Sequence, residues 1–142
     1  MSHFLEHLLF KGTRQRSAKQ ISQTVEGVGG YINAFTGEEN TCYYAKASHR
    51  HLEILLEVLA DMYRHPKLSV TDIAKERQII KEELLMYRDQ PDHYVQELLA
   101  ETLWPGHPLG RALTGTPESL DGMQRATLLD FKARHYVPVN TV

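Results

Sequence analysis

The sequence predicts an α+β domain in which helices pack on one face of a mainly antiparallel sheet. Apolar residues recur at helical spacing through most of the 142 residues, which indicates amphipathic helices. One central stretch, YINAFTGEENTCYYAKAS, instead combines β-branched and aromatic residues around a glycine-containing turn, and predicts two paired strands. The chain is 42% hydrophobic and 24% charged, a composition typical of a single soluble, globular domain with a substantial core.

Capping and helix-breaking residues divide the first half of the chain into elements. Gly12 stops the N-terminal helix, and Ser17 with Gln20 forms a capping box that opens the next one. Ser48 is expected to cap a third helix, which Pro66 ends because proline lacks the N–H that a helix interior requires. The three helices are predicted at residues 2–10, 17–28 and 49–65, with the two strands between the second and the third.

Similar signals organise the second half. Ser69, followed three residues later by Asp72, opens a long helix, and Pro91 suits the first turn of the helix after it. Three glycines and three prolines predict a loop in PGHPLGRALTGTP. The helices are predicted at residues 69–89, 91–104 and 123–135. The final residues, VPVNTV, are expected to begin a further strand, and Trp104 to anchor its helix in the core.

Charge and cysteine usage exclude several classes of protein. Lysine and arginine number 16 against 18 acidic residues, a near-balance that argues against a nucleic-acid binder. No apolar run approaches the ~20 residues of a membrane span. The first residues, MSHFLEHLLF, lack the basic region and cleavage site of a signal peptide, and the compartment is not indicated. A single cysteine, Cys42, excludes an internal disulfide and a cysteine-based zinc site.

The N-terminal helix carries a polar stripe made of His3, Glu6 and His7 on an otherwise apolar surface. A helix that is apolar on nearly every side is normally buried, and buried polar groups need partners. Two imidazoles one turn apart can reach one metal ion at about 2.0–2.1 Å, and Glu6 lies close enough to touch a water on that ion. The alternative is a satisfied pair of core histidines beside a surface glutamate.

The helix predicted at residues 69–89 offers candidates for a third metal ligand. Glu76 and Glu83 are seven residues apart and lie inside its apolar arc, whereas Glu82 lies on its polar side. Carboxylates on a core-facing arc are unusual. They either pair with lysine or arginine from another helix or bind the same ion as the histidines. The histidine pair favours the metal, with Glu83 or Glu76 as the third ligand.

Four motifs follow one another along nearly the whole chain: SHFLEHLLFKGT with its inverted zinc motif H-x-x-E-H, GGYINAFTGEENTCYYAKAS, KERQIIKEELLMYRDQPD and PGHPLGRALTGTPESL. In this order they resemble the pitrilysin/insulinase family of zinc peptidases, which includes the mitochondrial processing peptidase. The resemblance implies a zinc metalloendopeptidase that hydrolyses peptide bonds in peptides or unfolded segments.

The resemblance also assigns roles to individual residues. It implies one Zn²⁺ per chain, held by His3, His7 and Glu83. Glu6 would be the general base, and a zinc-bound water the nucleophile. Glu76 would support the site through hydrogen bonding.

Substrate and partner expectations follow from the same resemblance. Asn33, Ala34 and Phe35 correspond to the edge strand on which family substrates lie as an added β-strand. Family domains have strands before the zinc helix and a further strand after the last helix. We therefore expect residues 1–142 to be one incomplete metallopeptidase domain that works with a second homologous domain or subunit. The alternative is a non-catalytic structural or partner subunit of the same fold.

A basic cluster follows the N-terminal helix and comprises Lys11, Arg14, Arg16 and Lys19. Such a cluster is able to meet an acidic substrate. Charge clusters of this kind are more often solvated, so the preferred interpretation is a hydrated loop with no partner.

Overall fold

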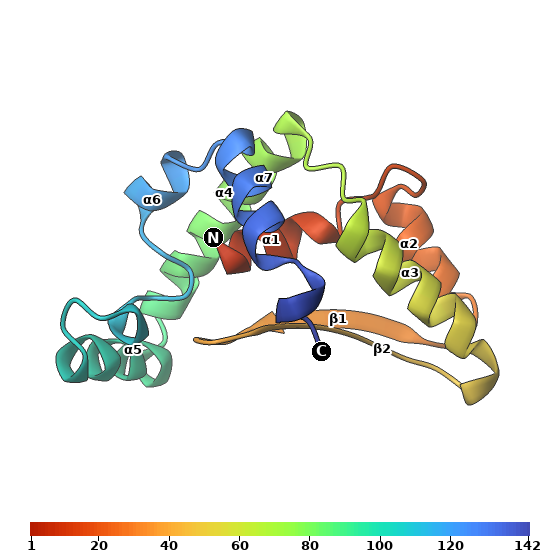
Figure 1. Cartoon of the computed structure of the whole chain (residues 1–142). Helices are drawn as coiled ribbons and strands as arrows, with labels where there is room; N and C mark the ends of the chain where they lie inside the picture. The colour runs from red at the N-terminus through yellow and green to blue at the C-terminus, as the bar shows by residue number, and fades with distance from the viewer.

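The computed structural model describes all residues, 1–142, and contains seven α-helices and one two-stranded antiparallel sheet (Figure 1). The α-helices are α1 (Ser2–Leu9), α2 (Ala18–Glu26), α3 (Leu52–Arg64), α4 (Val70–Arg88), α5 (Pro91–Leu103), α6 (Pro117–Asp121) and α7 (Arg125–His135). The strands are β1 (Tyr31–Thr36) and β2 (Thr41–Lys46), and short 3₁₀ helices occur at η1 (His49–His51), η2 (Pro108–Gly110) and η3 (Pro138–Asn140). Helices lie over one face of the hairpin, as predicted. No helix is both long and apolar enough to cross a bilayer.

The β1–β2 hairpin has one face toward the helices and one away from them. Its register pairs Tyr31 with Lys46 and Thr36 with Thr41. Because directly opposed residues share a face and the faces alternate along a strand, Ile32 and Tyr43 point toward the helices and pack against the core. This alternation also places the side chain of Thr36 on the helix-facing side, at the end of β1.

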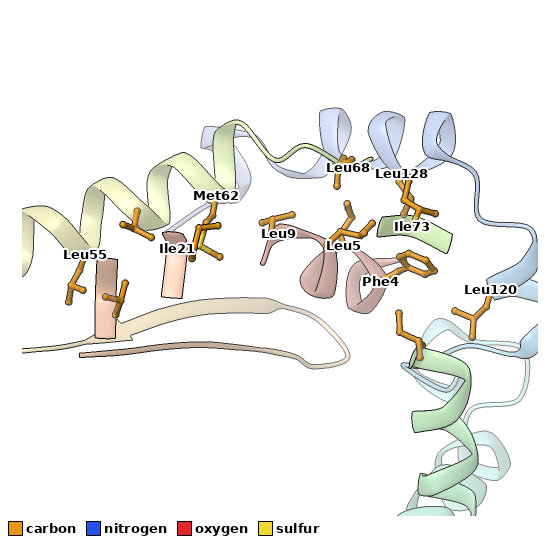
Figure 2. Packing of buried hydrophobic residues seen from close by; sticks show 14 residues of the cluster. Phe4, Leu5, Leu9, Ile21, Leu55, Met62, Leu68, Ile73, Leu120 and Leu128 are labelled. Atoms are coloured by element: carbon orange, nitrogen blue, oxygen red, sulfur yellow. The ribbon is translucent and has the colours of Figure 1, made fainter. Parts of the chain in front are cut away.

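Helix α1 lies at the centre of the hydrophobic core. Its residues Phe4, Leu5, Leu8 and Leu9 are each at most 1% exposed. Figure 2 shows α1 between side chains of α2 and α3 on one side and side chains of α4 and α7 on the other. A helix with apolar residues on most of its surface is stable only when surrounded in this way, so the sequence-based prediction of a buried N-terminal helix is confirmed.

The two predicted N-caps at the helices beside α1 are present. Ser17 and Gln20 form the capping box of α2, and Ser69 Oγ accepts the backbone N–H of Asp72 at the start of α4. Each cap satisfies a backbone N–H that the helix itself leaves without a partner. The long helix α4 therefore begins at a defined residue, and this sets which of its side chains face α1.

Three local expectations are wrong: a helix cap, a C-terminal strand and a core tryptophan. Ser48 makes no side-chain cap; its carbonyl accepts the His51 N–H at 2.9 Å, which closes a 3₁₀ turn before α3 begins at Leu52. The C-terminal residues form η3 instead of a strand, because no strand lies beside them to pair with and side-chain bonds from Asn140 and Thr141 hold the turn. Trp104 is 44% exposed, since α5 packs mainly against α4 and η2 and buries none of its residues.

A buried polar network joins the loop after α1 to α3. Asp61 is 6% exposed, and one of its oxygens accepts hydrogen bonds from Thr13 and Arg16, both at 2.7 Å. Burial opposes the charged form of Asp61, but the hydrogen bonds from Thr13 and Arg16 outweigh burial and hold the pKa below its ordinary value. The expectation of a hydrated loop is therefore wrong for Arg16, while Arg14 and Lys19 are exposed as expected.

Asp61→Asn is expected to lower the free energy of unfolding by about 2–3 kcal/mol at pH 7. A fully buried pair would cost ~3–5 kcal/mol, and partial exposure of Arg16 reduces this. Because folding lowers the pKa of Asp61, its contribution is complete above the unfolded value of ~3.9 and is lost as the pH falls below it. Urea unfolding at pH 7 and pH 3 measures both effects. Asp130→Asn, in an exposed pair with Arg134, is the control and should cost less than ~0.5 kcal/mol.

Candidate metal centre

Helices α1 and α4 bring three potential metal ligands together. The Nε2 atoms of His3 and His7 lie 3.7 and 3.5 Å from one carboxylate oxygen of Glu83. One ligand atom from each residue lies within 4.8 Å of the other two. The histidines are one helical turn apart on α1, and the packing of α1 against α4 places Glu83 opposite both.

The distances from the Glu83 oxygen to the two histidine nitrogens fit a zinc ion. Tetrahedral coordination at about 2.0–2.1 Å places ligand atoms about 3.3–3.4 Å apart, close to the observed separations. The same separations are too long for good hydrogen bonds between the histidines and the carboxylate. Two imidazole nitrogens and one carboxylate are also a known catalytic zinc set that leaves a position open. The distances are therefore more consistent with coordination of a zinc ion than with direct hydrogen bonds between the histidines and Glu83.

The protonation of His3 agrees with this interpretation. Burial lowers the pKa of His3, and its effect exceeds the opposing influence of the nearby Glu83 carboxylate. The neutral imidazole is consequently favoured, and only that form binds a metal ion.

Glu76 lies on the other side of the His7 ring. Its Oε2 is 3.1 Å from His7 Nδ1, the ring nitrogen that faces away from Glu83, and its Oε1 is 2.9 Å from Lys11 Nζ. Glu76 is 3% exposed. Helical spacing left Glu76 and Glu83 open as the third ligand, and the family resemblance favoured Glu83. The geometry brings Glu83 to the two histidines and gives Glu76 the position of a hydrogen-bond partner behind one of them.

Glu6 faces the hairpin from the same stripe of α1. Its Oε2 accepts a hydrogen bond of 2.5 Å from Thr36 Oγ1, and Thr41 Oγ1 is 3.3 Å from the same hydroxyl. Thr36 therefore orients one carboxylate oxygen of Glu6. Thr36 directly follows Asn33, Ala34 and Phe35 in the sequence, but no contact between Thr36 and Glu6 was expected.

A second residue missed from the sequence is Tyr87, whose hydroxyl donates to Glu83 Oε1 at 2.9 Å. This hydrogen bond, together with burial, raises the pKa of the Tyr87 phenol, so the group remains a donor. The spacing of four residues along one helix is a signal that could have identified it.

The proposed substrate-binding residues Asn33, Ala34 and Phe35 lie on β1, directly before Thr36. They are not among the residues that meet at the metal centre. Strand β1 pairs only with β2, so its other edge has no neighbouring strand. Phe35 is 53% exposed and lies beside Tyr44 on the face away from the helices. The strand therefore has a free edge that ends beside Glu6.

Comparison with known proteins shows the family of this chain. The family model for insulinase, peptidase family M16, matches residues 1–117. The chain belongs to the M16 peptidase family. An uncharacterised zinc protease of Bacillus subtilis is 40% identical to this M16 chain over 142 residues, which are 100% of this chain and 35% of that protein. A second uncharacterised zinc protease, from Mycobacterium leprae, is 40% identical over 141 residues, or 99% of this chain and 32% of that protein. The chain thus spans about a third of the length of these curated relatives.

Solved structures show the same M16 fold. A protease from Helicobacter pylori superposes with a TM-score of 0.92 at 28% identity, over 98% of this chain and 34% of that one. Pitrilysin superposes with a TM-score of 0.80 at 28% identity, over 94% of this chain and 15% of that one. An inactive M16 domain from Pseudomonas fluorescens has a TM-score of 0.79 at 18% identity, which shows the fold alone. The M16 fold is therefore found both in proteases and in a domain named inactive.

Proposed function

We propose that this M16 chain carries the zinc site of a metalloendopeptidase that hydrolyses peptide bonds in peptides or unfolded segments. The observation that carries the proposal is that ligand atoms of His3, His7 and Glu83 lie within 4.8 Å of one another, with Glu6 on the same stripe of α1. These three residues would hold one Zn²⁺. When bound, zinc supplies Lewis acidity, which polarises a carbonyl and lowers the pKa of a water to about 7.

Glu6 is the general base in this proposal. Its Oε2 is occupied by the hydrogen bond from Thr36, so Oε1 is the oxygen left to accept a proton from the attacking water. After the water oxygen has bonded to the scissile carbonyl carbon, the same carboxyl group returns the proton to the leaving amine. Thr36 keeps the carboxylate from rotating between the two transfers. Glu76 accepts the Nδ1–H of His7 and so leaves Nε2 free for the metal.

The substrate would bind as an extended chain along β1. Asn33, Ala34 and Phe35 lie on the edge that has no neighbouring strand, and main-chain hydrogen bonds to such an edge bind peptides with little demand on their sequence. This preference suits unfolded segments, because most backbone groups of a folded protein are already paired within it.

A second homologous domain or subunit is part of the proposal. The shared stretch is only about a third of each curated relative, which leaves room for such a domain. We also propose that residues 1–142 form part of one larger domain. The outer edge of β2 has no neighbouring strand, and Tyr31 and Phe35 are about half exposed on the hairpin face away from the helices; further strands of a larger domain would cover both features.

The second candidate function is a non-catalytic partner subunit; the observation in its favour is that a Pseudomonas fluorescens M16 domain named inactive has a similar fold. The presence of metal-ligating residues distinguishes an enzyme from a non-catalytic subunit. A scaffold needs no metal ligands, whereas this chain brings two histidines and a glutamate to metal spacing and holds a further glutamate beside them. We therefore favour the enzyme.

Zinc loading followed by dialysis is expected to leave about one zinc per chain, measured by elemental analysis together with circular dichroism. His7→Ala should reduce the bound zinc to background, because it removes one of the three ligands. His49→Ala is the matched control: it changes an exposed histidine in η1 and should retain the metal. A folded wild-type protein that holds no zinc, or His7→Ala protein that holds as much as wild type, would contradict the proposed site.

A further inference from the structure

Lys11 occupies an unexpected position for a residue of a basic cluster. Its ammonium lies 2.9 Å from Oε1 of Glu76, whose other oxygen is 3.1 Å from His7 Nδ1. We propose that Lys11 is a positioning residue of the metal centre: by holding Glu76, it keeps the His7 ring turned so that Nε2 faces the metal. This inference rests on the proposed zinc site and adds a residue to it.

The two contacts of Glu76 together fix its carboxylate. One oxygen contacts Lys11 and the other contacts His7, so rotation of the group would break both interactions at once. The Glu76 side chain is 4% exposed, and solvent therefore does not replace a lost partner. A buried carboxylate that loses its partner is strongly destabilised. The orientation of Glu76 thus depends on Lys11 as well as on His7.

The charge on Lys11 is needed because His7 supplies none when it binds a metal. A histidine ligand is neutral, with its proton on one ring nitrogen and its lone pair on the other. The Nδ1–H can then donate to Glu76, but the carboxylate remains a buried negative charge. Lys11 is the only lysine or arginine paired with Glu76 and so provides the compensating positive charge.

The backbone holds Lys11 in place on both sides. The Lys11 N–H donates to the Leu8 carbonyl at 3.1 Å, which continues the turn beyond α1. Gly12 follows with φ +113, a conformation that side-chain-bearing residues rarely adopt, and its carbonyl accepts the Lys67 N–H at 3.0 Å. The Lys11 side chain reaches Glu76 on α4 while 36% of it remains exposed.

An exposed ion pair on α4, the helix that carries Glu76, can be compared with the Lys11–Glu76 pair. Lys81 Nζ lies 2.7 Å from an oxygen of Asp121, but Asp121 is 61% exposed, and pairs of this kind contribute little. The two pairs have similar distances and differ in the burial of the carboxylate. Lys81→Met is consequently the matched control for Lys11→Met.

The test measures zinc affinity by competition with a chelator, and the tautomer of His7 by nitrogen NMR, on metal-free and zinc-loaded protein. Lys11→Met should weaken zinc binding by about 10-fold or more, the usual effect of losing an outer hydrogen-bond partner. It should also reduce the population of the His7 tautomer with the proton on Nδ1. Lys81→Met should change neither quantity. Lys11→Arg keeps the positive charge and should restore affinity to within about threefold of wild type.

A double variant links the effect to Glu76. If Lys11 acts through that carboxylate, Lys11→Met combined with Glu76→Gln should weaken zinc binding no more than Glu76→Gln alone. Additive losses would overturn the inference, as would a folded Lys11→Met protein with wild-type affinity and a wild-type His7 spectrum. If Lys11→Met does not fold, the zinc affinity of Lys11→Arg protein tests the inference. An affinity near wild type supports it, and a loss of 10-fold or more overturns it. Wild-type protein that binds no zinc would instead refute the metal site itself.

Discussion

Glu6→Gln is expected to reduce peptide hydrolysis by about 10²–10⁴-fold while the protein retains its zinc. Glutamine preserves the size of the side chain and an oxygen that can accept the Thr36 hydrogen bond. It cannot accept a proton from water, so the loss falls on the catalytic step. Initial rates on an unstructured fluorogenic peptide, measured with the second domain or subunit present, give the effect.

The matched control for this prediction is Glu26→Gln, which makes the same chemical change at an exposed position on α2. It should leave both hydrolysis and zinc content unchanged. Wild-type turnover by Glu6→Gln protein would remove Glu6 as the base. Loss of zinc together with loss of activity would indicate that Glu6 supports the metal instead.

Glu83→Gln is expected to weaken zinc binding by more than about 100-fold. Outer hydrogen-bond partners of ligands typically contribute 10–100-fold, and a direct ligand should contribute more. Glu83 has a carboxylate oxygen 3.5 and 3.7 Å from the two histidine Nε2 atoms, and Tyr87 holds its other oxygen. Glutamine has a similar shape but no charge, so the change removes a ligand without opening a cavity. Chelator competition measures the affinity.

Glu82→Gln tests whether this effect belongs to one position. Glu82 precedes Glu83 on α4, but its side chain is exposed on the far side of the helix. Zinc affinity of the Glu82→Gln protein should equal that of wild type. Equal losses in the two variants would show that Glu83 is not a ligand and that only the net charge of α4 matters.

Local signals in the sequence were sufficient for much of the fold. The capping residues Ser17 and Ser69 identified the starts of α2 and α4, because a cap acts within three residues of its own position. Helical periodicity also placed His3, Glu6 and His7 on one stripe of a buried helix. The start of α3 and the structure of the C-terminal residues were less predictable. The 3₁₀ turn η1 precedes α3, and the expected C-terminal strand is replaced by η3. Both outcomes depend on neighbouring elements that the local sequence does not reveal.

Long-range contacts account for the functional residues that the sequence did not identify. Lys11 and Arg16 belong to a basic cluster that we expected to be hydrated, and each instead pairs with a buried carboxylate. The sequence indicated only that Thr36 belongs to a strand; its hydrogen bond to Glu6, 30 positions earlier, depends on the tertiary structure. The helical spacing of Glu76 and Glu83 showed that both face inward, but not which of them reaches the histidines.

The sequence by itself determined the helices, the hairpin and the donor atoms available to a metal, because these depend on spacing along a single element. Only the tertiary structure decided which glutamate lies beside which histidine nitrogen. The packing of α1 against α4 brings Glu83 to the Nε2 atoms of His3 and His7 and leaves Glu76 at Nδ1 of His7. Both carboxylates lie on the inward face of α4 but seven residues apart, so they reach different nitrogens of His7. Which carboxylate meets which nitrogen depends on how the side chains of the two helices interlock in the core.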